Sequence, residues 1–345
     1  MDQGLLTGER VLRVGTRSVR LHRRILLLGT ALAGLLLALI AASLMFGGIR
    51  MDFGALLEVF AGRGSDSAQR SVLGRRLPRV LTAAGVGMLL GASGALFQSL
   101  TRNPLGSPDV IGLTSGAAAG AVAQIVLFGG GVLPTALAAV AGGVFSALLV
   151  YLLSLRDAVT GGLRLILVGI GVGALATAAT SLILLRANTQ DATLATLWTA
   201  GSLTGRGWPH AVAVGVAVLA LLPLLSVMGR GATLGEMGDD TALALGLPIE
   251  RLRMLSVLLA VTAAAAATAA TGPIAFIAFA SPQIIRRLAP RPETQIWLSA
   301  LGGAVLLCAA DLLAQSLSLP VRTPVGLVTS VLGGLYLLWL LARRI

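Results

Sequence analysis

The chain has 345 residues, of which 56% are hydrophobic and 12% are charged, and it carries a net charge of +12. Because soluble domains carry about 25% charged residues, this composition excludes an ordinary soluble domain. Apolar segments of membrane-spanning length recur from end to end, so the sequence predicts an all-α polytopic membrane protein.

The chain divides into a short basic start and one long apolar part. Residues 1–24 carry several arginines and no long apolar segment, so we expect a cytoplasmic N-terminal segment. Residues 25–345 predict a single transmembrane domain, whose first span is retained because no small-residue cleavage site follows it. We expect about ten spans, at 25–46, 78–100, 109–128, 132–154, 163–185, 209–228, 253–271, 273–289, 296–316 and 324–342.

Proline and glycine interrupt the pattern at the third and the eighth span. Pro104 and Pro108 bound the third span, and Gly272 and Pro273 bound the eighth, so we expect broken or partial helices there. Asn103 opens the stretch NPLGSPD, which proline and glycine force out of helix. This stretch is either a tight connection or a shaped element near the inner mouth of a pathway. We assign Asn103, Pro104, Pro108, Gly272 and Pro273 to the inner mouth or to the pathway itself.

The arginines predict which ends of the spans face the cytoplasm. With both termini inside, about two thirds of the 26 arginines fall on the cytoplasmic side. Four of the nine exceptions cluster at the outer mouth of the second span, as Arg70, Arg75, Arg76 and Arg79, and the positive-inside rule does not explain this cluster. Because the arginines flank apolar spans, membrane topology explains the net charge, and we expect no nucleic-acid partner.

Ionisable side chains are scarce inside the spans. Asp311 is the one acid well inside a span, and it is either a proton site or a group hydrogen-bonded to a neighbouring helix. An ion-driven transporter usually has more such groups, so we expect the driving energy to come from another chain. The chain has no lysine, which excludes a standard P-loop ATPase. No catalytic pair or metal-ligand spacing is present, so we predict no catalysis, no metal and no cofactor on this chain.

The stretch GEMGDDTALALGLPIERLR, at 235–253, gathers four of the chain's 14 acids in one cytoplasmic loop. Gly235 breaks the chain and Gly246 ends a helix, so we expect two short helices near 232–237 and 239–245. An apolar patch rimmed with charge predicts a docking surface, and a solvated loop is the alternative. The residues assigned to this surface are Gly235, Glu236, Asp239, Asp240, Ala242, Leu243, Leu245 and Gly246.

Four stretches resemble the signatures of a known family. In chain order they are RRLPRVL with GASGALFQSLTRNPLGSPDVIGLTSGA, then LGEMGDDTALALGLPIERLR, then GPIAFIAFASPQIIRRL, and finally AADLLAQSLSLPVRTPVGLVTSVLGG. Over roughly residues 25–342 the chain is similar to the FecCD family, the permease subunits of ABC importers for ferric siderophores, haem and vitamin B12. Within the family the greatest similarity is to the ferric enterobactin branch, through RNPLGSPDV, MGDDTALALG and AADLLAQ.

The resemblance implies a BtuC-like ABC importer permease fold of ten helices with inverted repeats, in the bacterial cytoplasmic membrane. It also implies several partners. A separate cytoplasmic ATPase binds the ATP, and an extracytoplasmic siderophore-binding protein, free in the periplasm or lipid-anchored, delivers the cargo. The other permease position is filled by a homologous second subunit or, as in simpler relatives, by a second copy of the same chain.

The resemblance also carries roles onto two sets of residues. Arg76 and Arg79, with Arg75 beside them, match the family motif RxPR, whose arginines face acidic residues on the binding protein. The stretch at 232–247 matches the coupling helices that lie in a groove of the ATPase. We therefore expect the outer arginines to dock the binding protein and the acids and leucines listed above to dock the ATPase.

Three positions depart from the family pattern. Gln283 stands where many relatives have histidine, so any role of that histidine is absent. Gln315 stands where many vitamin B12 permeases have arginine, which removes a docking contact and favours the siderophore branch. Arg322 and Thr323 precede Pro324 where relatives have Glu-Leu, so that glutamate is not carried over.

The sequence thus predicts a non-catalytic permease subunit for a ferric siderophore. The main alternative is an importer of vitamin B12 or haem with the same fold. An ion-driven secondary transporter and a membrane-embedded enzyme are the alternatives from other classes, and uptake that needs ATP but survives an uncoupler separates the first of them from an ABC importer.

Overall fold

The computed structural model describes residues 9–14, 17–46, 51–104, 106–156, 159–160, 162–291, 293–316 and 323–342. The departure from the family pattern at Arg322 lies outside the described residues. So do residues 343–345, on which the cytoplasmic placement of the C-terminus partly depends.

Helices make up nearly all of the described chain. In order they are α1 (Arg23–Met45), α2 (Phe53–Phe60), α3 (Asp66–Ser71), a π-helical turn (Val72–Arg76), α4 (Leu77–Thr101), a 3-10 turn (Pro108–Ile111), α5 (Leu113–Phe128), α6 (Val132–Ser154), α7 (Gly162–Leu184), α8 (Thr189–Thr199), α9 (Trp208–Gly235), α10 (Asp239–Ala244), α11 (Ile249–Thr271), α12 (Ile277–Leu288), α13 (Ile296–Ser316) and α14 (Val325–Ala342). Two small antiparallel hairpins pair β1 (Glu9–Val14) with β2 (Arg17–His22), and β3 (Leu155–Arg156) with β4 (Val159–Thr160).

The helical membrane fold expected from the sequence is confirmed. Within the described residues, each of the ten predicted spans coincides with a helix, and seven helices are long and apolar enough to cross a bilayer. Helices α5 and α14 are apolar but shorter, and α12 has only 12 residues. The third and eighth spans are interrupted as predicted. Gly112, at φ 72°, separates the 3-10 turn from α5, and Phe276, at φ 70°, begins α12 after a non-helical entry.

Helix α4 is the most enclosed of the long helices and packs against α9, α11, α12 and α13. Glycine permits these contacts. A Cβ atom at Gly87 would lie 2.4 Å from the carbonyl oxygen of Gly303, and one at Gly91 would lie 2.1 Å from the carbonyl oxygen of Ser299. The glycines four residues apart therefore let the backbones of α4 and α13 touch, as their spacing predicts.

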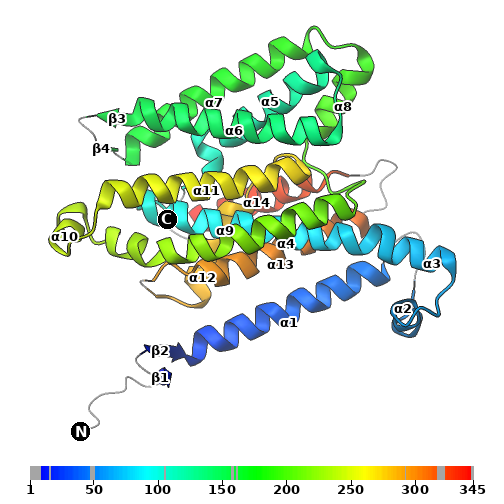
Figure 1. The fold of residues 1–345 in the computed structure, drawn as a ribbon, viewed down its shortest axis with the longest axis horizontal. Coiled ribbons are helices and arrows are strands. Elements are labelled where there is room, and N and C mark those ends of the chain that lie inside the picture. Colours follow the sequence, from blue (N-terminus) through cyan, green and yellow to red (C-terminus); the bar gives the residue numbers. More distant parts are fainter. Residues whose placement is uncertain are drawn as a thin grey trace.

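The connections gather at two ends of the bundle (Figure 1). One end holds α10, the β3–β4 hairpin and the β1–β2 hairpin, and we call it the α10 end. The opposite end holds α2, α3 and α8, and we call it the α3 end. Helices α5, α6 and α7 form a layer on one side of the central helices, and α1 lies along the other side.

The connection between α9 and α11 differs from the prediction of two short helices. Helix α9 runs without a break to Gly235, so the expected helix at 232–237 is mostly the last turn of α9. This last part of α9 packs closely against α11, since a Cβ atom at Gly231 would lie 2.7 Å from the Leu252 side chain. Only α10 is a separate short helix. It ends as predicted, because Gly246 adopts φ 79° and the amides of Gly246 and Leu247 bond back to Leu243 and Ala242.

Candidate functional site

At the α3 end, the three predicted docking arginines have different surroundings. Arg75 is exposed. Arg76 is half-buried and donates from Nη1 to the carbonyl oxygen of Leu44 at 2.7 Å, which satisfies the C-terminal end of α1. Arg79 is also half-buried and is turned toward α13. Of these three arginines, Arg75 is therefore the one exposed to a partner.

Arg79 and Asp311 form a bidentate ion pair, which the sequence interpretation did not connect. Arg79 donates from Nε to Oδ2 of Asp311 at 3.0 Å and from Nη2 to Oδ1 at 2.7 Å. Gln315 donates to the same carboxylate at 2.9 Å. The Asp311 side chain is 2% exposed and the Arg79 side chain 23%. The lone acid predicted inside a span thus has hydrogen-bonded partners, and Gln315 supports the ion pair.

At the α10 end, the loop after α4 is fastened to α12. Gln283 donates from Nε2 to the carbonyl oxygen of Pro104 at 2.7 Å and to Oε1 of Gln98 at 2.8 Å. Gln98 in turn donates to the carbonyl oxygen of Phe279 at 3.1 Å. Pro108 then begins the 3-10 turn that leads to α5. The segment with Asn103, Pro104 and Pro108 therefore forms a hydrogen-bonded, non-helical connection between α4 and α5.

Gly272 and Pro273 lie at the opposite end of the bundle from Asn103, so the five residues do not form one mouth. Gly272 adopts φ 76°, and a Cβ atom there would lie 2.2 Å from the carbonyl oxygen of Trp198 at the end of α8. Because α11 has 23 residues and crosses the whole bundle, its C-terminal end lies at the α3 end, opposite Asn103. These two residues therefore form a glycine-dependent turn against α8.

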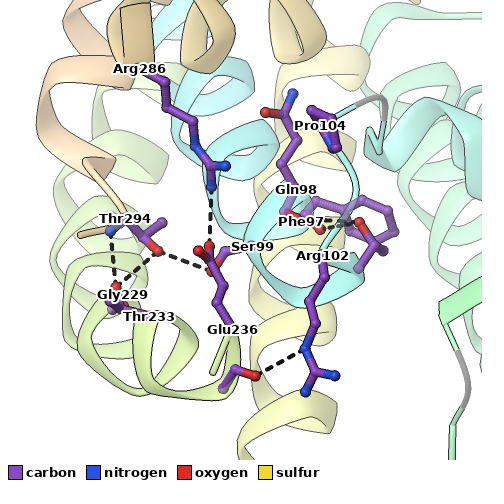
Figure 2. Close-up of polar contacts among 12 residues, drawn as sticks. Phe97, Gln98, Ser99, Arg102, Pro104, Gly229, Thr233, Glu236, Arg286 and Thr294 are labelled. Carbon is purple, nitrogen blue, oxygen red and sulfur yellow. Dashed lines mark hydrogen bonds and ion pairs between the residues drawn. The ribbon is translucent and has the colours of Figure 1, made fainter. Parts of the chain in front are cut away.

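A polar network joins the ends of α4, α9 and α12 to the chain before α13, and Figure 2 shows it. Thr294 donates from its amide to Oγ1 of Thr233 at 2.9 Å and from its hydroxyl to Ser99 at 3.0 Å. Arg286 donates to Glu236 at 3.1 Å. Glu236, predicted as a docking acid, is thus held by α12.

The first acid of α10 has two arginine partners. Arg253 of α11 donates from Nη2 to both carboxylate oxygens of Asp239 at 3.1 Å, and Arg102 at the end of α4 also pairs with it. Partial burial raises the pKa of Asp239, but the hydrogen bonds and charges of Arg253 and Arg102 outweigh burial and hold that pKa below its ordinary value. No side chain caps the start of α10: its N-cap residue is Gly238, and the Asp239 carboxylate bonds to these arginines instead.

Fewer residues of α10 are exposed to a partner than the sequence predicted. Leu243 and Leu245 are exposed, as is Asp240. Ala242 is fully buried, so its placement on the exposed face was wrong. Its carbonyl accepts the closing bond of the helix, and that turn folds Ala242 inward. Met237, which the sequence reading left out, adds a further exposed apolar side chain beside this surface.

Sequence reasoning counted Arg102, Arg253 and Arg286 only as markers of the cytoplasmic side. Each is a partner of an acid in the α9–α11 connection. The one available signal was that a run of acids needs nearby cations, because an unpaired, partly buried acid is unfavourable. That signal does not say which arginines of the chain supply them.

Comparisons with known proteins agree with this geometry. Residues 35–343 match the FecCD transport family. The chain is 42% identical to the ferric enterobactin transport system permease protein FepG of Escherichia coli (strain K12), over 86% of this chain and 90% of that protein. It is 36% identical to the achromobactin permease CbrC of Dickeya dadantii (strain 3937), over 90% and 89%. It is 35% identical to the hemin permease HmuU of Yersinia pestis, over 90% and 93%.

A solved structure supports the fold. An inward-facing metal-chelate type ABC transporter superposes with a TM-score of 0.82 at 27% identity, covering 92% of this chain and 99% of that one. The expected ABC importer permease fold is therefore confirmed, together with the resemblance to the family and to FepG. The relatives are transport permeases for different iron chelates and haem, so similarity alone leaves the cargo of this chain open.

Proposed function

Because the chain belongs to the FecCD transport family, we propose that it is the non-catalytic permease subunit of an ABC importer that carries an enterobactin-like ferric siderophore across the cytoplasmic membrane. The observation that carries the choice of cargo is the 42% identity to FepG over 86% of the chain. Haem is the second candidate, favoured by the 35% identity to the hemin permease.

The α10 end faces the cytoplasm in this proposal, with both termini on that side. Support comes from the arginines, most of which flank the spans at this end, as the positive-inside rule requires. A FepC-like ATPase binds and hydrolyses the ATP and sits against α10. Leu243 and Leu245 provide an apolar contact surface, and Asp240 adds a charge at its rim.

The α3 end faces outward and receives the siderophore-binding protein. Arg75 offers an exposed guanidinium to an acidic partner, and Arg76 and Arg79 lie beneath it, bonded to α1 and α13. Beside this chain stands a FepD-like second permease or a second copy of the same chain. ATP-driven closure of the ATPases then moves α10, and the helices around the dimer axis open the path to one side at a time.

Reconstitution tests the function and the cargo together. The chain is co-expressed with a candidate second permease and ATPase, and proteoliposomes with ATP inside are supplied with loaded binding protein. We expect accumulation of radiolabelled ferric enterobactin that requires ATP and persists with an uncoupler. A chain that takes up labelled haem but no ferric siderophore in this assay would establish the second candidate instead. Uptake abolished by the uncoupler would contradict an ABC importer.

A further inference from the structure

The two adjacent acids of α10 differ in their surroundings. The Asp240 side chain is exposed, at the rim of the apolar surface of α10. The Asp239 side chain is 37% exposed and accepts hydrogen bonds from Arg253, whose side chain is only 12% exposed. Of the two acids, only Asp240 is thus free to meet a partner protein.

Asp239 joins α10 to the ends of three long helices. Arg253 belongs to the second turn of α11. Arg102 follows α4 directly and adopts φ 48°, a left-handed conformation that turns the chain back at this point. Arg102 pairs with Asp239 and also donates from Nε to the carbonyl oxygen of Gly235, at the end of α9, at 3.0 Å. We call the set of Asp239, Arg102 and Arg253 the Asp239 clamp.

Few other interactions hold α10 in place. Glycines at positive φ flank it on both sides, Gly238 at φ 115° and Gly246 at φ 79°. Ala242 is its one buried side chain. Within the described part of the chain, Asp239 is the only α10 side chain with a hydrogen-bond partner. The orientation of α10 relative to α4 and α11 therefore depends on the Asp239 clamp.

We propose that Asp239 is a positioning residue, which transmits movement of α10 to α4 and α11 through Arg102 and Arg253 and does not itself contact the ATPase. This inference rests on the proposed function, in which the ATPase sits against α10. The Arg102–Asp239 pair is exposed on both sides and contributes little to stability, and Arg253 keeps Glu250 as a partner when Asp239 is lost. Loss of the clamp should therefore leave the protein folded and bound to its ATPase, while ATP hydrolysis becomes poorly coupled to transport.

The test compares Asp239→Asn with its neighbour, Asp240→Asn, in the complete reconstituted complex. Three quantities are measured: ATPase recovered with the permease, ATP hydrolysed, and ferric enterobactin transported. For Asp239→Asn we expect normal recovery and a ratio of transport to hydrolysis about threefold to tenfold below wild type. Asp239→Glu, which keeps the charge, should restore part of that ratio. Asp240→Asn should keep the wild-type ratio and can reduce only ATPase recovery.

A double variant tests whether the residues act as a unit. Arg253→Gln should lower the ratio as Asp239→Asn does, and the double variant should be no worse than the more impaired single variant. The inference is overturned if Asp239→Asn transports with the wild-type ratio, or if clearly less ATPase is recovered with Asp239→Asn than with the wild-type permease. A wild-type complex that binds no ATPase and shows no ATP-dependent uptake would instead refute the proposed function.

Discussion

Replacing Arg79 by glutamine should be one of the most destabilising single changes at the α3 end. The substitution removes both donors of the bidentate pair and leaves the Asp311 carboxylate, 2% exposed, with Gln315 as its remaining partner. Removal of one partner of a buried ion pair typically destabilises a protein by about 3–5 kcal/mol, because the other charge is left uncompensated. We expect a loss in that range.

Replacing the other partner of the pair, Asp311, should destabilise the protein less. Asp311→Asn leaves an unpaired guanidinium, but the Arg79 side chain is 23% exposed and can turn toward water. Asparagine also keeps a carbonyl oxygen that accepts from Gln315. We expect a loss of about 1.5–3 kcal/mol, the range for hydrogen bonds to charged groups. In the double variant Arg79→Gln/Asp311→Asn no buried charge remains, so it should be more stable than Arg79→Gln alone.

Equilibrium unfolding of the purified chain in mixed detergent micelles measures these differences. Arg75→Gln is the matched control, because Arg75 is exposed in the same cluster and its loss should change the free energy of unfolding by less than about 0.5 kcal/mol. If Arg79→Gln proves as mild as Arg75→Gln, or if Asp311→Asn is the more damaging of the pair, the buried ion pair does not stabilise this end of the bundle.

Four further outcomes follow from the structure. Gln283→Leu leaves the carbonyl oxygen of the loop after α4 and the Gln98 side chain without their donor, and should lower the free energy of unfolding by about 1–3 kcal/mol in the same assay. Gly91→Ala should impair folding, because its Cβ would lie 2.1 Å from a backbone oxygen, whereas Gly171→Ala, with open space around it, should be tolerated in a detergent-stability comparison. Arg75→Glu should reduce stimulation of ATP hydrolysis by the binding protein, and full stimulation would remove it from the docking surface. A carboxyl with a lowered pKa contributes stability above its unfolded pKa of about 3.9 and loses it only as the pH falls through the folded value. The difference between wild type and Asp239→Asn in the transport ratio should therefore be equal at pH 6 and pH 8, and its disappearance at pH 6 would contradict the assigned ionisation.

Local patterns were sufficient to predict the helices. A segment of about 20 apolar residues has few structural choices in a bilayer, so the ten spans follow from composition and length. Proline and glycine likewise predicted the irregular starts of α5 and α12, because their effects on the backbone are local. The exception is the extension of α9 past 232, where the sequence predicted a separate short helix and α9 instead continues to Gly235 beside α11. The packing of α9 against α11 joins two segments separated in the sequence and has no local signal.

For the same reason, local sequence patterns could not predict which arginine pairs with which acid. Arg79 and Asp311 lie 232 residues apart, and Arg102 and Asp239 lie 137 apart. Many arginines were available to each acid, and only the packing of α4 against α13 and α11 selects among them. The sequence therefore identified the acids as unusual, while the structure assigned their partners and showed that Asp239 and Asp240 belong to different surroundings.

The position of α4 has a mechanical consequence. With 25 residues, α4 is about 37 Å long at 1.5 Å per residue. Arg79 is bonded at one end and Arg102 at the other, and Gly87 and Gly91 touch α13 near the middle. Because α4 is one continuous helix with contacts at both ends and in its middle, a movement of its end at Arg102 would also reach the contacts at Gly87, Gly91 and Arg79. Helix α4 therefore connects the α10 end of the bundle mechanically to the α3 end.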